Sequence, residues 1–225
     1  MSEPNNPAPA PFYEVRLYRV APGRLADMES RLLNELPWLF QKHGLLSIGA
    51  WSVLAGGNLP AIVYLLKWES MVDREKAWSG FYSDKEWLEV RARTNAGSEL
   101  VERVSAWITT PNVALPKVNL PSATQALSDM HEMHVFQTAI GQAPAINDYL
   151  TNVFIPRLHA AGCVVVALLD IKMGEATPSV VLLLSWPNFA ARLTGHEALS
   201  ALNRQFSKGG ALLGRHDTYV LRQLS

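Results

Sequence analysis

The chain has 225 residues, and its 20 basic and 20 acidic side chains give a formal net charge of zero. This balance excludes the basic surface typical of proteins that bind nucleic acid or an anionic membrane. The single cysteine, Cys163, excludes an internal disulfide framework, and the N-terminal residues lack the pattern of a secretory signal. We therefore expect a cytoplasmic protein with no nucleic-acid or membrane partner.

Residues 1–11 contain four prolines among small and polar residues, so we expect a disordered tail. The first strand follows, from Tyr13 to Val20, and its residues alternate in character. Tyr13, Val15 and Leu17 share one face, and Glu14, Arg16 and Tyr18 share the other. We expect the first face to pack against helices and the second to face away from them.

Hydrophobic spacing predicts a helix over residues 24–41, which Pro37 should kink or break near Leu36. A strand over 45–54 turns through 56–58 into a third strand over 61–68. Helices over 70–82 and 83–94 and a strand over 99–109 complete the unit. This order, β-α-β-β-α-β, is the split βαβ arrangement of ferredoxin-like folds.

The second half repeats the first at a constant offset, because 131 − 13 and 141 − 23 are both 118. Its strands, turns and helix proline fall close to register with those of the first half, and Trp186 stands where Trp68 stood. The expected organisation is therefore a first repeat over 12–110, a proline-containing linker over 111–129 and a second repeat over 130–225.

Each repeat covers one sheet face with helices and leaves the other face in need of a cover. The economical arrangement packs the two sheets face to face. We therefore expect an α+β fold in which tandem ferredoxin-like repeats form an α/β barrel, with helices outside and a cavity between the sheets. Homodimerisation is also expected, because outer helices or sheet edges of such units often remain free.

The opening stretch, Tyr13 to Tyr18 followed by Pro22-Gly23, resembles the start of the NIPSNAP family. The likeness extends through Lys42-His43-Gly44, Trp68-Glu69-Ser70 and the stretch from Ser83 to Trp87. The family is similar to the dimeric α/β-barrel superfamily, which includes cofactor-free monooxygenases, haem-degrading enzymes and isomerases. That resemblance implies the fold more strongly than any one activity.

The chain departs from the family where a histidine often stands in the third strand, since it has Tyr64 there. The two repeats also differ from each other. Arg16 becomes His134, and Tyr18 becomes Phe136. A function that the family histidine performs therefore does not transfer to this chain.

The polar faces of the two opening strands supply the candidate chemistry. Glu14, Arg16 and Tyr18, with Glu132, His134 and Phe136, are expected to line the cavity, because alternate strand residues lie about 7 Å apart on one face. His134 and Glu132 would be the catalytic acid–base pair, and Arg16 would clamp a carboxylate. The alternative is that these groups only satisfy one another as buried polar pairs.

Aromatic side chains on the strands would form the walls of the substrate site. Tyr64, Trp68 and Trp186 are the candidates, although aromatic residues also dominate ordinary cores. The segment from His131 to His134 is not a metal motif, because strand residues three apart face opposite ways. No metal ligation or cofactor is therefore expected from sequence motifs.

Two classes of function remain open. One is an enzyme that binds a small hydrophobic or aromatic molecule between the sheets and catalyses cofactor-independent oxygenation, isomerisation or other acid–base chemistry. The other is a non-catalytic ligand sensor or protein-interaction module. Haem binding through a histidine is a third, less favoured alternative.

Overall fold

The structure is a computed structural model that describes residues 10–119, 130–174, 177–209 and 212–224. The first half runs in the order β1 (Phe12–Val20), α1 (Leu25–Ser30), η1 (Arg31–Glu35), α2 (Leu36–His43), β2 (Leu46–Ala55), β3 (Ala61–Trp68), α3 (Met71–Ser83), α4 (Lys85–Asn95) and β4 (Val101–Pro111). The expected N-terminal tail falls largely on residues 1–9, outside the described residues.

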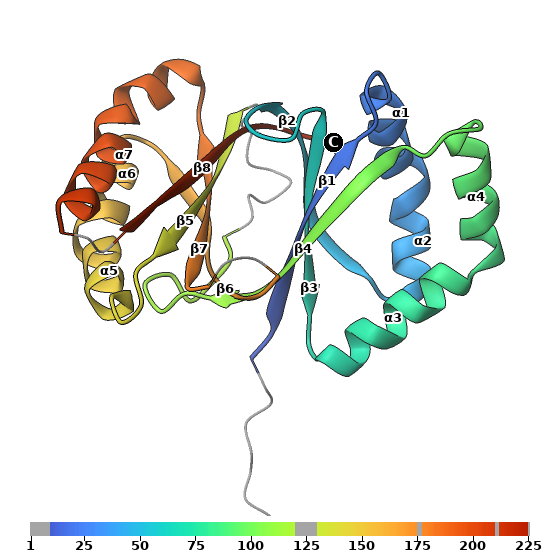
Figure 1. Cartoon of the computed structure of the whole chain (residues 1–225), viewed down its shortest axis with the longest axis horizontal. Coiled ribbons are helices and arrows are strands. Elements are labelled where there is room, and N and C mark those ends of the chain that lie inside the picture. The colour runs from blue at the N-terminus through green and yellow to red at the C-terminus, as the bar shows by residue number, and fades with distance from the viewer. Residues whose placement is uncertain (1–9, 120–129, 175–176, 210–211, 225) are drawn as a thin grey trace, which may run out of the picture.

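The second half has the same plan. It runs in the order β5 (Met130–Thr138), α5 (Ala143–Tyr149), η2 (Leu150–Phe154), α6 (Ile155–Ala160), β6 (Val164–Met173), β7 (Ser179–Trp186), α7 (Phe189–Gly209) and β8 (Leu212–Gln223). Helices cover the outside of each half, and the strands of the two halves meet in the middle (Figure 1). No helix among the described residues is long and apolar enough to cross a membrane.

The proline in the first helix of each half leaves the helix continuous but irregular. Pro37 and Pro156 each occupy the first turn of an α-helix, directly after the π-helical segment η1 or η2. A proline lacks the N–H of a normal turn and its ring crowds the preceding turn, so a wider π turn accommodates it. The expected disturbance near Leu36 is therefore a change of helix type rather than a break.

All eight strands pair antiparallel in the order β1-β3-β2-β8-β5-β7-β6-β4 and close into a barrel. Each half contributes four neighbouring strands, and two junctions join the halves: β2 with β8, and β4 with β6. The predicted α/β barrel of two ferredoxin-like units is confirmed. The described part of the expected linker runs beside β6, where the backbone N–H groups of Asn112 and Asn119 donate to Leu168 and Val166.

The barrel interior is filled by side chains from both halves. Tyr13, Val15 and Leu17 pack there against Trp51, Trp107, Met133, Val135 and Tyr219. The expected face assignment is therefore wrong: the Tyr13 face points into the barrel, and the Glu14 face points toward the helices. Pockets lined by described residues are found outside the barrel, on the helix sides of the sheets, and the expected cavity between the sheets stays a prediction.

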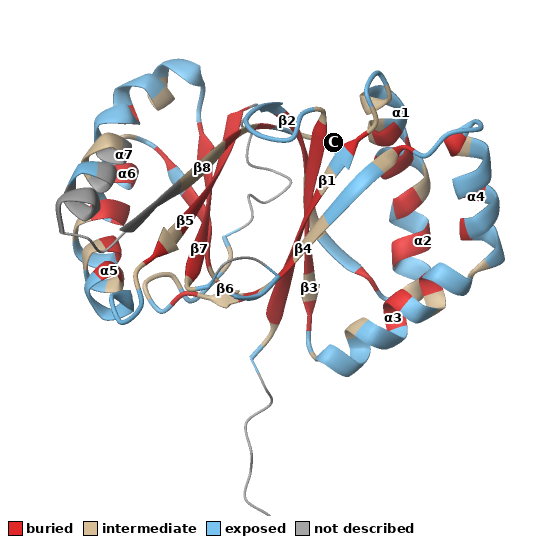
Figure 2. Cartoon of the chain, viewed as in Figure 1, coloured by how far each residue is buried: buried red, intermediate tan, exposed pale blue. Residues whose placement is uncertain are grey.

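The reversal has a physical cause. Both faces of β1 are buried along most of its length, as Figure 2 shows for the central strands, so neither face looks solvated. A closed barrel interior excludes water and has only other strand residues to pair with, which favours apolar filling. The helix side can carry buried polar groups because α3 supplies partners for them.

Candidate functional site

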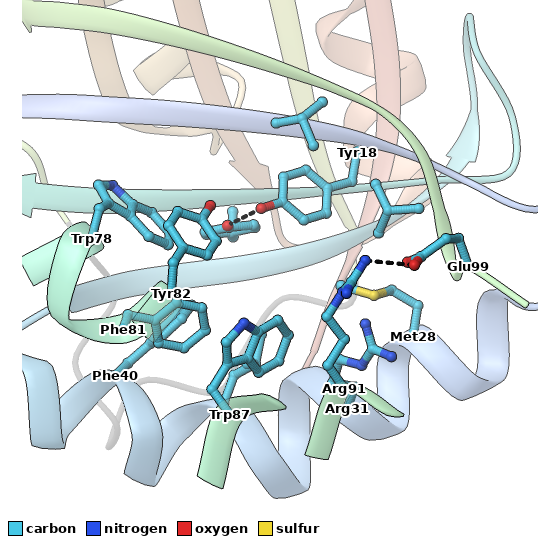
Figure 3. Close-up of a pocket in the computed structure, with 14 residues that line it drawn as sticks. Tyr18, Met28, Arg31, Phe40, Trp78, Phe81, Tyr82, Trp87, Arg91 and Glu99 are labelled. Atoms are coloured by element: carbon cyan, nitrogen blue, oxygen red, sulfur yellow. Dashed lines mark hydrogen bonds and ion pairs between the residues drawn. The ribbon is translucent and has the colours of Figure 1, made fainter. Parts of the chain in front are cut away.

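A cavity of about 220 Å³ lies in the first half between the outer face of the sheet and helices α1 to α4. Its aromatic wall is formed by Phe40, Trp78, Phe81 and Trp87. Polar groups lie at two places on this wall. Tyr18, Tyr64 and Tyr82 form one group, and Arg31, Arg91 and Glu99 form the other (Figure 3).

Behind the cavity, the carboxylate of Glu14 is fully buried and anchors a hydrogen-bond network. It accepts from Arg16 Nη1 at 2.6 Å, from Arg74 Nε and Nη2 at 2.8 and 2.9 Å, and from Trp68 Nε1 at 3.1 Å. Burial alone would raise the pKa of Glu14, but Arg74 and Arg16 outweigh burial and hold that pKa below its usual value. Glu14 is therefore an ionised anchor at neutral pH rather than a free base.

Arg16 connects this anchor to the cavity. Its Nη1 donates to Glu14, while Nε and Nη2 donate to the hydroxyl of Tyr18 at 3.2 and 3.0 Å. Its guanidinium also lies 4.3 Å from the ring centroid of Trp78. Burial would lower the pKa of Arg16, but the neighbouring Tyr64, Tyr18 and Glu14 raise it, so the side chain stays cationic.

These donors fix the direction of the next hydrogen bond. A phenol oxygen has two acceptor positions and one proton, and Arg16 occupies the acceptor positions of Tyr18. Tyr18 therefore donates its proton to Tyr64, whose oxygen is 2.7 Å away. The proton of Tyr64 is then free to point at a ligand in the cavity that Tyr64 lines.

Tyr64 remains protonated over the physiological range. Burial raises the pKa of Tyr64 well above that of a free phenol, and the neighbouring Tyr18 raises it further. Burial also raises the pKa of Tyr82, which stands half-exposed at the edge of the cavity. The cavity thus presents phenolic O–H donors backed by the Arg16 cation, an arrangement suited to a ligand oxygen that carries partial or full negative charge.

The second half keeps the anchor of this network. Glu132, fully buried, accepts from Trp186 Nε1 at 2.9 Å and from Arg192 Nε at 2.9 Å. Trp68 and Arg74 of the first half become Trp186 and Arg192 at the same offset of 118 residues, because 186 − 68 and 192 − 74 are both 118. The glutamate–tryptophan–arginine contact is therefore a shared structural element, and it holds the helix after each third strand against the sheet.

The remainder of the network differs between the halves. Positions occupied by Arg16, Tyr18 and Tyr64 in the first half are occupied by His134, Phe136 and Leu182 in the second. His134 Nδ1 lies 3.0 Å from His216 Nε2 and 3.2 Å from Thr218 Oγ1, and Phe136 stacks on His216. Burial, and then the charge of His134, lowers the pKa of His216 to about 4.

The nine residues predicted as site residues do not form one cavity. Glu14, Arg16, Tyr18, Tyr64 and Trp68 do gather, but on the helix side of the first half. Glu132, His134, Phe136 and Trp186 gather on the helix side of the second half, in a separate core cluster or beside it. Their predicted convergence between the sheets is wrong, because the barrel interior takes the opposite face of each strand.

The predicted acid–base pair is in contact but is committed to other partners. His134 Nε2 lies 3.7 Å from Glu132 Oε2, while both carboxylate oxygens of Glu132 accept bonds from Trp186 and Arg192. The catalytic role of the pair stays a prediction. Among the described residues, no three histidine, cysteine, aspartate or glutamate side chains are placed to hold a metal ion.

Sequence reasoning missed the helix residues that complete the first-half site. Arg74, Trp78 and Tyr82 lie on α3, and Arg31 and Trp87 lie on η1 and α4. One signal was available, since Arg74 and Arg192 occupy equivalent places after the equivalent tryptophans Trp68 and Trp186. A repeated arginine in this position indicates a shared partner, and the repeated glutamates were the candidates.

Solved structures share this fold over nearly the whole chain at low identity. A candidate monooxygenase of Fusobacterium nucleatum aligns at a TM-score of 0.62 with 10% identity, covering 96% of this chain and 93% of that one. A candidate monooxygenase of Lactobacillus acidophilus aligns at 0.58 with 9% identity, covering 96% and 95%. An anthrone oxidase-like protein aligns at 0.59 with 14% identity, covering 96% and 92%. At these identities the likeness is one of fold.

A search of curated protein sequences finds no match. The NIPSNAP family model matches residues 13–116, which include all of β1 to β4 beyond Phe12 and every residue that lines the cavity. That the second half is also a NIPSNAP-type repeat stays a prediction. The part of the chain that holds the candidate site is therefore the part that is similar to the NIPSNAP family.

Proposed function

We propose that the first-half cavity binds a small aromatic or hydrophobic molecule through a carbonyl or phenolic oxygen, which accepts a hydrogen bond from Tyr64. The observation that carries this proposal is the hydrogen-bonded chain from Arg16 through Tyr18 to Tyr64, which ends at an aromatic-walled cavity. A concave, largely apolar site with a few converging polar groups is the usual form of a small-molecule site. Its volume of about 220 Å³ suits a ligand of one or two rings.

The proposed chemistry is stabilisation of an oxyanion. A protonated Tyr64, with the Arg16 cation two steps behind it, would favour the enolate or phenolate form of the bound molecule over its neutral form. Enolates and phenolates take part in isomerisation, and they are the electron-rich species that react with molecular oxygen without a cofactor. The names of the similar structures refer to oxidation, but an oxygenase activity is a proposal for this chain.

Binding without catalysis is the second candidate, and a specific observation favours it. Glu99 is the one carboxylate among the described residues that line the cavity, and Arg91 pairs with it. A reaction that begins with proton abstraction would therefore depend on displacing that pair or on the ligand's own acidity. Proton–deuterium exchange at the α-carbon of a bound ketone, followed by NMR, separates the candidates, because only a catalyst accelerates it.

The binding proposal is tested by fluorescence titration with 1-naphthol, since Trp78 and Trp87 line the cavity. We expect saturable binding to one site per chain. Tyr64→Phe should weaken it about 5- to 10-fold, the usual value of one hydrogen bond. Tyr13→Phe removes a hydroxyl from the barrel side of the same sheet and should leave the affinity unchanged. Equal affinities for wild type and Tyr64→Phe would refute the assignment.

Location and assembly belong to the same proposal. A cytoplasmic site of action is supported by the single, buried Cys163. A homodimer would have to use helical faces, because the edges of β2, β4, β6 and β8 are already paired within the chain.

A further inference from the structure

Arg31 lines the cavity and its side chain is buried. It is the first residue of η1, and its counterpart at the offset of 118 residues is Tyr149, because 149 − 31 is 118. Arg31 is buried with 4% exposure, and Tyr149 is partly buried against the core cluster of the second half. The second half therefore has an uncharged aromatic residue at this place, and a buried arginine there calls for another explanation.

The hydrogen bonds of Arg31 use only neutral partners. Its Nε donates to Thr94 Oγ1 at 2.8 Å and its Nη2 donates to Asn95 Oδ1 at 2.6 Å, while its Cζ lies 5.7 Å from the ring centroid of Trp87. Among the described residues it forms no ion pair, and its Nη1 has no acceptor. A buried guanidinium without a carboxylate is costly, because burial disfavours its charge. Burial correspondingly lowers the pKa of Arg31 to about 10, which leaves it cationic at neutral pH.

The acidic groups nearest to Arg31 are bound to other arginines. Asp27 pairs with Arg24, and Glu99 pairs with Arg91. All four of these charged residues act on the pKa of Arg31. Three arginines thus face two carboxylates, and this side of the cavity carries one uncompensated positive charge. Figure 3 shows Arg31 and Arg91 on the side of the cavity away from the Tyr82 and Tyr18 hydroxyls.

From this geometry we infer that the cavity takes an aromatic carboxylate, with its carboxylate on Arg31 and its phenolic or carbonyl oxygen on Tyr64. The inference rests on the proposed function and deepens it by naming the substrate class. A carboxylate would supply the acceptor that Nη1 lacks and would neutralise the buried cation. The aromatic wall between the two polar groups would hold the ring.

The test compares matched ligands that differ only in charge. The probes are 4-hydroxybenzoate, 4-hydroxyphenylacetate and 3-(4-hydroxyphenyl)propionate, which differ in the distance between their two polar ends. Each is compared with its neutral amide. Affinities are measured by titration calorimetry with the full chain. For at least one member, wild type should prefer the carboxylate about 10-fold or more, since a hydrogen bond to a charged group outweighs a neutral one.

Two variants locate the preference. Arg31→Leu removes the cation and leaves an apolar side chain, and it should bind carboxylate and amide equally. Arg31→Lys keeps the charge without the planar fork and should retain part of the preference. Tyr64→Phe should weaken both ligands of a pair alike.

The outcomes distinguish a failure of this inference from a failure of the proposed function on which it rests. Amides that bind to wild type as tightly as their carboxylates would overturn the carboxylate assignment and leave the aromatic site standing. The carboxylate assignment also fails if Arg31→Leu is folded, as circular dichroism would show, and keeps the carboxylate preference. If neither probes nor 1-naphthol bind wild type, the proposed function itself fails.

Discussion

At the scale of single residues, the two buried glutamates occupy the same place in their halves but have different neighbours. Glu14 and Glu132 each hold an arginine and a tryptophan, and both are shielded from water. Glu14 additionally holds Arg16, and through it the tyrosine pair of the cavity. Stability should therefore depend on both glutamates, and ligand binding should depend on one.

Glu14→Gln and Glu132→Gln test this difference as a matched pair. Each substitution removes a buried carboxylate from its arginine partners and should lower the free energy of unfolding by about 3 to 5 kcal/mol, measured by urea denaturation. Glu14→Gln should also weaken 1-naphthol binding, because Arg16 loses its anchor. A Glu132→Gln variant that loses binding to the same extent would contradict the assignment of the site to the first half.

The lowered pKa of Glu14 sets the direction of its pH dependence. Burial opposes ionisation, but Arg74 and Arg16 keep the folded-state pKa below the unfolded value. The stabilisation is complete above the unfolded pKa and is lost as the pH falls through the folded one. Glu14→Gln should remove this part of the acid sensitivity. The difference in unfolding free energy between wild type and variant should therefore become smaller at low pH.

His131 gives a second pH prediction, in which a buried base rather than a buried acid causes the loss of stability at low pH. It lies inside the barrel with 1% exposure, its ring centroid 5.9 Å from that of Trp51, and burial lowers its pKa to about 4. Below about pH 6.5, His131 binds a proton in the unfolded chain but stays neutral in the native barrel. The free energy of unfolding therefore falls as the pH drops from about 6.5 to the folded pKa. Between about pH 7 and about pH 5, wild type should lose about 2 kcal/mol more than His131→Leu in urea unfolding.

The exposed His159 is the control for that measurement. His159→Ala should follow wild type across the same pH range. A pH dependence that is unchanged in His131→Leu would show that the barrel histidine is not the group that titrates.

At the scale of elements, helix α3 carries much of the cavity. It supplies Arg74, Trp78, Phe81 and Tyr82, and it begins where Ser70 Oγ accepts from the backbone N–H of Asp73 at 3.0 Å. Ser70→Ala should lower the unfolding free energy by about 1 kcal/mol, the usual value of an N-cap. Ser79→Ala, at an exposed mid-helix position, should be neutral or slightly stabilising. Equal effects of the two variants would contradict the capping role.

The elements also show what the sequence could and could not predict. Alternation in β1 correctly groups Glu14 with Arg16 and Tyr18. The repeat correctly identifies β5 as the counterpart of β1 in the second half. The direction of each face could not be predicted, because both faces are buried and the deciding partner, Arg74, lies 60 residues further along the chain. The charge of Arg31 was equally hidden, since only the fold shows that its position is a core position.

At the scale of the molecule, the barrel is closed by β2 against β8 and by β4 against β6. A chain of residues 1–119 alone would expose the edges of β2 and β4, which are expected to pair with a second copy. We predict that this fragment forms a symmetric homodimer, with twice the fragment mass in light scattering. A fragment that is folded and monomeric at all concentrations would contradict this view of closure.

The location of the ligand is the central claim, and a crystal of the full chain soaked with 4-bromophenol tests it most directly. The bromine gives an anomalous signal that marks its position without assumptions about the ring. We predict a single bromine in the first-half cavity, between Tyr64 on β3 and Trp87 on α4, with the phenol oxygen at hydrogen-bond distance from the Tyr64 hydroxyl. A bromine inside the barrel, or beneath α7 beside His134, would contradict it.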